Sequence, residues 1–192
     1  DKYLESTLIL AEMAERYSRD LAITLTRNNN SSLTTTFQYC LREIIRNSYE
    51  HGNTDEVWVC GEYWQSRNTA QIAIIDRGRG IWSSLRENRH YNPRNDADAN
   101  KLALQPGVSS AFGLKQDPFD IWGNSGFGLF TSSSICCCGG SFWLCSGKDA
   151  TLVNSEGQSN YGIDFNGTAV CMNIVTSKTS EIERLLPEIV RA

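Results

Sequence analysis

The sequence lacks the features that mark membrane-spanning chains and chains that coat nucleic acids. No apolar run approaches the roughly 20 residues that cross a bilayer. Positive charge is not in excess, because 18 Lys and Arg residues stand against 22 Asp and Glu residues, which gives a net charge of −4. Such a balance carries no direct signature of nucleic-acid binding. We therefore expect neither a membrane nor a nucleic acid among the partners.

Histidine is scarce and cysteine is odd in number: the chain has 2 histidines, His51 and His90, and 7 cysteines. An odd set of thiols spread through apolar segments is typical of a reducing compartment, so we expect a cytoplasmic location. Three cysteines are consecutive, at residues 136–138. Neighbours on a helix point about 100° apart and lack the usual gap between metal ligands. We expect these thiols to be buried and inert.

The rest of the composition is that of a globular domain, with 40% hydrophobic and 21% charged residues in 192. A chain of this length is enough for one domain with a sizeable core. We expect a single domain over residues 1–192, cut from a longer protein. Its first part, residues 1–33, should be a helix followed by a polar linker.

Hydrophobic periodicity predicts the order of the helices and strands. A helix is expected at residues 3–26 and a second at 37–51, capped within 34–36 and stopped by Gly52. Strands at 56–63 and 70–76 flank a turn-rich run, which predicts an antiparallel hairpin. The second half of the chain predicts a helix at 128–138, strands at 141–146, 151–155 and 168–175, and a helix at 180–190 that Pro187 disturbs near its end.

Residues 83–122 differ from the rest of the chain. They show little periodicity and are rich in proline, glycine and asparagine. An irregular segment of about 40 residues inside a compact domain is most often a functional lid or a disordered loop. We predict a lid that closes over a bound ligand.

The second predicted helix has two distinct arcs. One arc would pack against a sheet and contains Phe37, Cys40, Leu41, Ile44, Ile45 and Ser48. The other carries Glu43, Asn47 and Glu50, spaced about one helical turn apart. An amide oxygen is a hard ligand for Mg²⁺, and a carboxylate can accept a proton. The alternative interpretation is a solvated polar face without chemistry.

Two further segments carry polar residues beside glycines. Asp76 ends an apolar strand and is followed by Arg77-Gly78-Arg79-Gly80. A carboxylate placed there can accept a hydrogen bond from a ligand amine while the backbone approaches closely. Later, the run Gly123-Asn124-Ser125-Gly126-Phe127-Gly128 leads into a helix, and a glycine-rich turn at a helix N-terminus presents N–H groups to phosphate. This run is not a Walker-type P-loop.

In this order the segments resemble the GHKL ATPase superfamily, which includes gyrase B, the large heat-shock chaperones, histidine kinases and MutL proteins. The four matching boxes start at Glu43, Asp76, Gly123 and Gly167, and the resemblance covers residues 37–175. It implies an α/β chain with the Bergerat ATP-binding fold. That fold is an α+β two-layer sandwich, with a mixed, largely antiparallel sheet, helices on one face, and ATP between the helices and a lid.

The resemblance also implies roles for single residues, with ATP and Mg²⁺ as cofactors. Glu43 matches the general base and Asn47 the Mg²⁺ ligand. Asp76 matches the carboxylate that reads the adenine amino group, in the box that also holds Gly78, Arg79 and Gly80. The phosphate-contacting turn is matched by Gly123, Gly126, Phe127 and Gly128, and the hydroxyl that supports the adenine-binding aspartate is matched by Thr168.

Arg79 resembles an arginine that lies beside adenine in the gyrase branch. The alternative for Arg79 is a surface arginine paired with Glu50. Gly80 matches the glycine that lets adenine lie close to the backbone. His51 is interpreted as a helix-end residue near the negative end of the helix dipole rather than as a catalyst.

The function implied is Mg-dependent ATP binding and hydrolysis, with lid closure signalling to other domains or to a protein partner; a homodimer is compatible with this. Two alternatives stay open. Residues 49–52 and 125–130 look like those of protein serine kinases that resemble anti-sigma factors. The other alternative is a nucleotide-binding switch without significant turnover. Residues 1–36 contain no histidine, which argues against a histidine kinase with its acceptor on a preceding helix.

Overall fold

The computed structural model describes residues 2–54, 56–109 and 126–189. Its helices are α1 (Lys2–Thr26), α2 (Ser32–Glu50), α3 (Gly80–Arg86), α4 (Asp96–Ala103), α5 (Gly128–Gly139) and α6 (Thr179–Ile189). Its strands are β1 (Val57–Trp64), β2 (Thr69–Asp76), β3 (Gly140–Asn154) and β4 (Gly157–Val175), and short 3-10 turns lie at Gln65–Arg67 and Thr176–Lys178. No helix in the described ranges combines the length and hydropathy of a membrane span.

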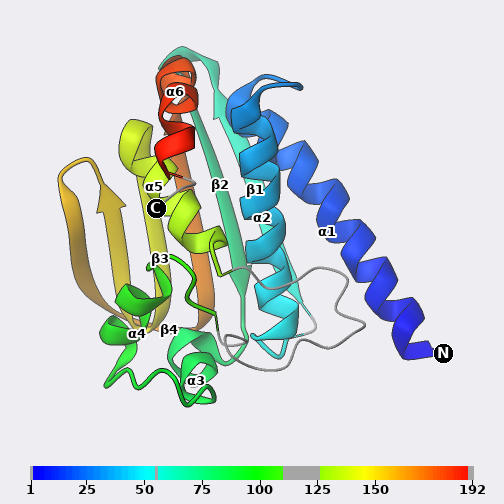
Figure 1. Ribbon diagram of the computed structural model, residues 1–192, viewed down its shortest axis with the longest axis vertical. Coiled ribbons are helices and arrows are strands. Elements are labelled where there is room, and N and C mark those ends of the chain that lie inside the picture. The colour runs from blue at the N-terminus through cyan, green and yellow to red at the C-terminus, as the bar shows by residue number, and fades with distance from the viewer. Residues whose placement is uncertain (1, 55, 110–125, 190–192) are drawn as a thin grey trace.

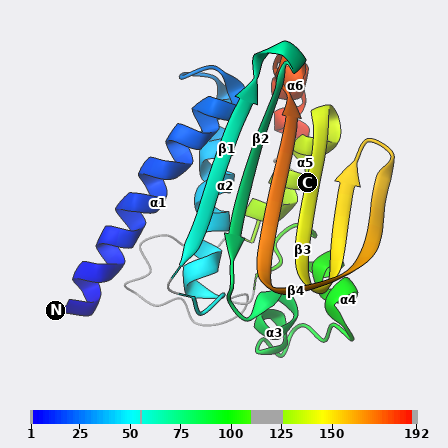
Figure 2. The same ribbon diagram turned by 180° about the vertical axis from the view of Figure 1, so that it is seen from behind.

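The strands form one sheet in the order β1-β2-β4-β3. Figure 1 shows α2, α5 and α6 over one face of this sheet, and Figure 2 shows the opposite face with no labelled helix over it. The chain is therefore an α+β two-layer sandwich with helices on one face, as predicted. Every described strand pair is antiparallel, so the expectation of a mixed sheet is wrong.

The core lies between the sheet and the helices because both elements present an apolar side there. In β2, Ala70, Ile72 and Ile74 are buried at alternate positions, which is the period of a strand. The predicted packing arc of α2, from Phe37 to Ser48, is buried against them. Fully burying one large aliphatic side chain stabilises a fold by about 1.5–3 kcal/mol. This packing holds α2 at a constant position over the ends of β2 and β4.

The hairpin of β3 and β4 is longer than the sequence predicted. β3 runs unbroken from Gly140 to Asn154, where two strands were expected, and β4 begins at Gly157 rather than at residue 168. The register shifts around Gly147. The first part of β4, which pairs with β3 beyond this irregularity, is mostly exposed. It therefore lacks the alternating buried apolar residues by which a strand is recognised in a sequence. Outside the core the hairpin is supported by contacts such as Trp143 against Tyr161, with ring centroids 5.4 Å apart.

Helix α2 begins earlier than predicted, at Ser32 rather than near Phe37. Its N-cap is Ser31, whose hydroxyl accepts a hydrogen bond from the Thr34 N–H at 3.1 Å. The carboxylate of Glu183 on α6 accepts from both the N–H and the hydroxyl of Ser32, at 2.8 and 2.7 Å. Because these donors are the ones a helix start leaves unpaired, the contact extends α2 by a full turn.

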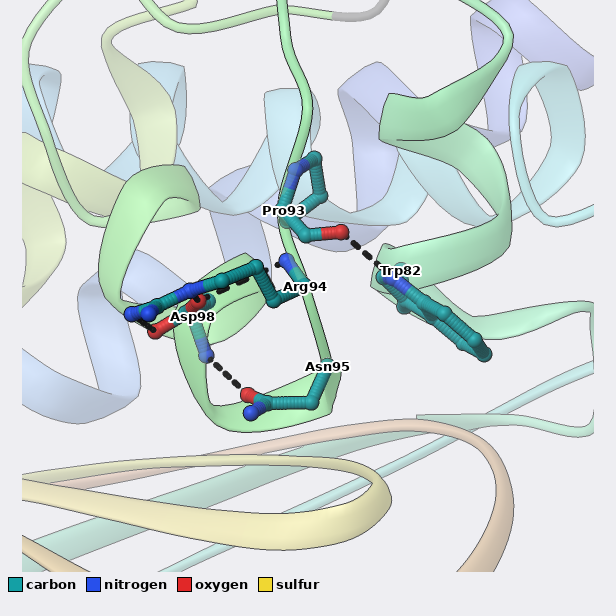
Figure 3. Close-up of polar contacts among 5 residues, drawn as sticks. All are labelled: Trp82, Pro93, Arg94, Asn95 and Asp98. Atoms are coloured by element: carbon teal, nitrogen blue, oxygen red, sulfur yellow. Dashed lines mark hydrogen bonds and ion pairs between the residues drawn. The ribbon is translucent and has the colours of Figure 1, made fainter.

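The predicted lid at residues 83–122 is not irregular throughout. It contains the end of α3 and all of α4, and residues 110–122 lie outside the described residues. Figure 3 shows how the connection between the two helices is closed: the Trp82 indole N–H donates to the Pro93 carbonyl at 3.0 Å. Asn95 caps α4 by accepting from the Asp98 N–H at 2.9 Å, and Arg94 pairs with Asp98 at 2.6 Å.

Helix α4 is also fastened to the sheet. The Asn100 side-chain amide, which is fully buried, donates to the Asp149 carboxylate at 3.0 Å. Asp96 accepts from the Lys148 N–H at 3.0 Å. Helix α4 is therefore held against β3 by hydrogen bonds, and the lid at residues 83–122 stays a prediction. The sequence hid this helix because its eight residues bury few large apolar side chains.

Gly167 brings β4 close to the end of β2, and this approach supports a prediction about stability. Its φ is +119°, and a Cβ there would lie 2.1 Å from the Asp76 carbonyl oxygen. We expect Gly167→Ala to lower the free energy of unfolding by about 3 kcal/mol in urea titrations. Gly157 is the matched control, because its φ is +116° and nothing lies within 4 Å of its Cβ position. Gly157→Ala should lower the free energy of unfolding by about 2 kcal/mol less than Gly167→Ala does. Equal decreases in the two variants would contradict the close approach of β4 to the end of β2.

Candidate functional site

Asp76 is the centre of a buried hydrogen-bond network at the end of β2. Its side chain is 3% exposed. One carboxylate oxygen accepts from the N–H groups of Gly78 and Thr168, at 2.9 and 3.1 Å, and the other accepts from the Ser48 hydroxyl at 2.9 Å. These three hydrogen bonds use much of the capacity of the carboxylate to accept, and none of the three donors is cationic. The network holds Asp76 in one orientation.

Two adjoining cavities lie between α2, α3, α5 and the sheet. The first, of about 50 Å³, is bounded by Asp76, Thr168 and Gly80 together with apolar side chains. The second, of about 70 Å³, is bounded by Glu43, Gly126 and Gly128. Both are also lined by a shared set: Asn47, His51, Ile81, Ser84 and Leu129. The shared residues make the two cavities parts of one cleft, with Asp76 at one end and Glu43 at the other.

Of the polar arc of α2, only Glu50 is exposed to solvent. Glu43 is buried, at 4% exposed, and Asn47 is half-buried at the junction of the two cavities. A Cβ at Gly128 would lie 2.7 Å from the Glu43 Cβ, so the N-terminus of α5 is in direct contact with the carboxylate-bearing residue. A larger residue at position 128 would push α5 away from α2. The alternative interpretation of this arc as a solvated surface is therefore wrong for Glu43.

Arg79 lies at the rim of the cleft rather than in its lining. Its guanidinium donates to the His51 carbonyl oxygen at 2.6 Å and forms an ion pair with Glu87. Its own N–H donates to the Gly52 carbonyl at 2.8 Å. Glu50, the suggested partner of Arg79, pairs with Arg46 instead, at 2.8 Å. Arg79 thus ties the start of α3 to the end of α2.

His51 closes α2 as its C-cap, as predicted, and Gly52 follows it. Its ring lines both cavities, which the sequence did not indicate. Burial lowers the pKa of His51 below its ordinary value; Glu50 opposes this shift, and Arg46 and Arg79 add to it. The neutral imidazole is therefore favoured at pH 7. Its buried Nε2 has no hydrogen-bond partner among the described residues.

Most of the residues singled out in the sequence line the cleft, but Gly78 and Arg79 do not. Thr168 supports Asp76 through its backbone N–H, whereas a hydroxyl was expected. Phe127 lines a separate cavity, beside Tyr39 and Thr131. Gly123 lies outside the described residues.

Two supporting residues were missed as parts of the site. The Ser48 hydroxyl, assigned to the packing arc, donates to Asp76. The Ser146 hydroxyl accepts from the Ile81 N–H at 2.9 Å and donates to the Gly167 carbonyl at 3.0 Å, which joins α3 to β4. The only indication in the sequence is a serine at a position expected to face the core, because a buried hydroxyl group needs a hydrogen-bond partner.

No described cysteine lines the two cavities, although Cys40 lies one turn before Glu43 on α2. Burial raises the pKa of Cys40 to about 12 and the pKa of Cys136 well above its ordinary value. Cys137 and Cys138 are half-buried, and burial raises the pKa of each. Thiols shifted in this direction are poor nucleophiles. Among the described residues no group of three or more His, Cys, Asp or Glu side chains is placed to hold a metal ion.

Comparison with known proteins gives little further information. Neither protein-family models nor curated proteins give a match for this chain. Among solved structures, the chain is similar to the crystal structure of the N-terminal domain of a DNA repair protein, with 15% identity and a TM-score of 0.36. The match covers 91% of this chain and 44% of the other, so the chain spans less than half the length of that structure. A likeness this weak carries no argument about function.

Proposed function

We propose that this chain is a GHKL-type domain that binds ATP with Mg²⁺ and hydrolyses it. The observation that carries the proposal is a single cleft with a rigidly held carboxylate at one end and a buried carboxylate beside a helix N-terminus at the other. These are the two ends that a nucleotide presents: a base with an exocyclic amine and a chain of phosphates. The family resemblance of the four boxes adds to this observation.

The Asp76 end suits adenine. Ile44, Ile74 and Val170 supply apolar walls for a flat ring, and Asp76 is the buried acceptor between them. An ionised carboxylate only accepts hydrogen bonds, so it selects a base that donates from an amino group. Three fixed donors leave the carboxylate little freedom to turn away.

The Glu43 end suits phosphates and water. Helix α5 begins at Gly128, which lines the second cavity. The first N–H groups of a helix have no partner within the helix, so a helix N-terminus binds phosphate favourably. Asn47 fits a Mg²⁺ ion, because this metal takes oxygen ligands and is usually held by one or two protein groups together with substrate phosphates. Bound there, Mg²⁺ would neutralise part of the phosphate charge.

Glu43 is the residue proposed to act on the nucleophile. Its carboxylate accepts a proton from a water that attacks the γ-phosphorus as the bond to the ADP oxygen breaks. The products are ADP and inorganic phosphate, and the proton passes from Glu43 to solvent. Burial of the carboxylate keeps bulk water from competing with the positioned one.

The cleft has to widen before it can hold a nucleotide. Its two cavities, about 50 and 70 Å³, are smaller than the roughly 300–1,000 Å³ typical of ligand sites. Ile81 on α3 and Leu129 on α5 line both cavities, so a nucleotide that occupies both would contact these side chains. We propose that the lid predicted at residues 83–122 moves as the cleft widens, and that its closure signals nucleotide binding to other domains or a partner.

The test is to titrate the purified chain with Mg-ATP in a calorimeter and then to follow phosphate release at saturating ATP. Saturable binding together with steady release supports the ATPase. Binding without release favours the nucleotide switch. Absence of binding overturns the proposal.

Asn47 provides a prediction at the junction of the cavities. We expect Asn47→Ala to weaken Mg-ATP binding by about tenfold or more and to lower turnover with it, because one oxygen ligand is lost. Asn47→Asp keeps an oxygen at this position and should retain Mg-dependent binding. Calorimetry with and without Mg²⁺ measures both variants. Equal ATP affinity for Asn47→Ala and the wild type at every Mg²⁺ concentration would remove Asn47 as a ligand.

One observation favours the protein serine kinase as a second candidate. A third cavity, of about 370 Å³, is lined by Tyr39 on α2 and by Phe127, which adjoins the glycines of the cleft. Tyr39 precedes Glu43 by one helical turn, so an acceptor hydroxyl could approach the same base from this side. Labelled phosphate appearing on an added protein rather than in solution would favour transfer.

A further inference from the structure

Arg46 lies on α2 between two carboxylates and has no role so far. Its Nη1 is 3.5 Å from Glu43 Oε1, and its Nε is 2.8 Å from Glu50 Oε1. The Arg46 side chain is 9% exposed, whereas that of Glu50 is 37% exposed. Arg46 is not among the residues that line either cavity of the cleft. Arg46 is therefore coupled to the cleft through its contact with Glu43 and through the effect of its charge on His51.

A buried carboxylate needs a partner to remain ionised. Desolvation penalises a buried charge by several kcal/mol, so an isolated Glu43 would tend to hold its proton. An arginine keeps its charge at every accessible pH and presents several donors in a fixed plane. Arg46 is the charged side chain that the described residues place against Glu43, and its position is in turn held by Glu50.

The other titratable groups that the described residues place near Glu43 are uncharged at neutral pH. Cys40, one turn earlier on α2, is a thiol whose pKa burial raises to about 12. His51 lines the same cavity, and burial lowers its pKa. The residues contributed to that cavity by α3 and α5 are Ile81, Ser84, Leu85, Gly128 and Leu129, which carry no charge. Among the described residues, the electrostatic support for an ionised Glu43 comes from Arg46.

We propose that Arg46 is a positioning residue that keeps the Glu43 carboxylate ionised and oriented toward the cleft, with Glu50 holding Arg46 in place. The catalytic part of this inference rests on the proposed ATPase function. A base must be ionised to accept a proton, so Arg46 would set the lowest pH at which the domain turns over. An opposite charge within about 4–6 Å commonly changes the titration midpoint of a carboxyl by 1–3 units.

The experiment compares Arg46→Gln with the wild type in two readouts. The first follows the Glu43 carboxyl by carbon NMR through a pH titration without nucleotide, and we expect its midpoint to rise by about 1 unit in the variant. The second readout is the rate of ATP turnover as a function of pH. We expect the pH at which turnover falls on the acidic side of this profile to rise by a similar amount, while ATP affinity at neutral pH stays unchanged. A purely structural loss would lower turnover equally at every pH.

Three variants make the test selective. Arg46→Lys keeps the charge and should return the acidic side of the pH–rate profile to its wild-type position. Arg42→Gln removes a charge from the same helix, where Arg42 pairs with Glu15 at 3.1 Å, and should leave the Glu43 midpoint at its wild-type value. Arg46→Met keeps the apolar stem and replaces Arg46→Gln if the latter does not fold.

The two readouts separate failure of this inference from failure of the proposed function. A Glu43 midpoint that is the same in Arg46→Gln, or in Arg46→Met, as in the wild type overturns the role of Arg46. A raised midpoint in a chain that neither binds nor hydrolyses ATP upholds the electrostatic coupling and overturns the function.

Discussion

Glu43→Ala is expected to lower the rate of ATP hydrolysis by roughly 10²–10⁴-fold while Mg-ATP still binds. The reason is that Glu43 lines the cavity at the phosphate end, whereas the adenine end and Asn47 stay intact. Loss of the buried carboxylate leaves Arg46 paired with Glu50, so the helix should remain folded. Phosphate release and calorimetric binding are measured on the same preparation.

The matched control is Glu56→Ala, because Glu56 is exposed and precedes β1 outside the cleft. It should hydrolyse ATP at the wild-type rate. Melting curves for both variants establish that they fold. A Glu43→Ala protein with wild-type turnover would remove the catalytic role and leave the nucleotide switch as the better proposal.

Asp76→Asn is expected to weaken ATP binding by roughly 10–100-fold, which corresponds to about 1–3 kcal/mol. The amide of asparagine brings two donors into a position where Ser48, Gly78 and Thr168 already donate. Its NH₂ group must then face one of these donors or the amino group of adenine. In either orientation at least one hydrogen bond is lost inside a buried site.

Two further variants identify the cause of that loss. Ser48→Ala removes one of the three donors and leaves the carboxylate, so its effect on ATP affinity should be smaller, about 0.5–1.5 kcal/mol. Asp164→Asn removes an exposed carboxylate that pairs only with Lys148 in the described chain, and it should bind ATP like the wild type. Unchanged affinity in a folded Asp76→Asn protein would contradict the assignment of the adenine end.

The fold was predictable wherever apolar periodicity was strong. The hairpin of β1 and β2, the helix at 128–138 and the first helix all lie within about one residue of expectation. In β2 the buried positions alternate, whereas β1 has no buried residue and is placed by its pairing with β2. Errors of extent came from contacts between distant parts of the chain. The early start of α2 depends on Glu183 of α6, 151 residues away, and no local pattern encodes that contact.

The site was predictable where a residue's chemistry was unusual for its place in the sequence. Asp76 after an apolar strand and Glu43 with Asn47 on one helical arc lie along one cleft in the structure. The supporting residues could not be found in the same way. Ser48, which donates to Asp76, and Ser146, which joins α3 to β4, look like small core residues. The pairing of Arg46 with both Glu43 and Glu50 is decided by three-dimensional packing.

The most direct test of the central claim is a single incubation of the wild-type chain and Glu43→Ala with γ-labelled ATP and Mg²⁺. Free phosphate and labelled protein are quantified together over time. The account predicts steady, Mg-dependent release of phosphate by the wild type and little or no release by Glu43→Ala. Release that is absent from the wild type, or equal in the two proteins, would contradict it.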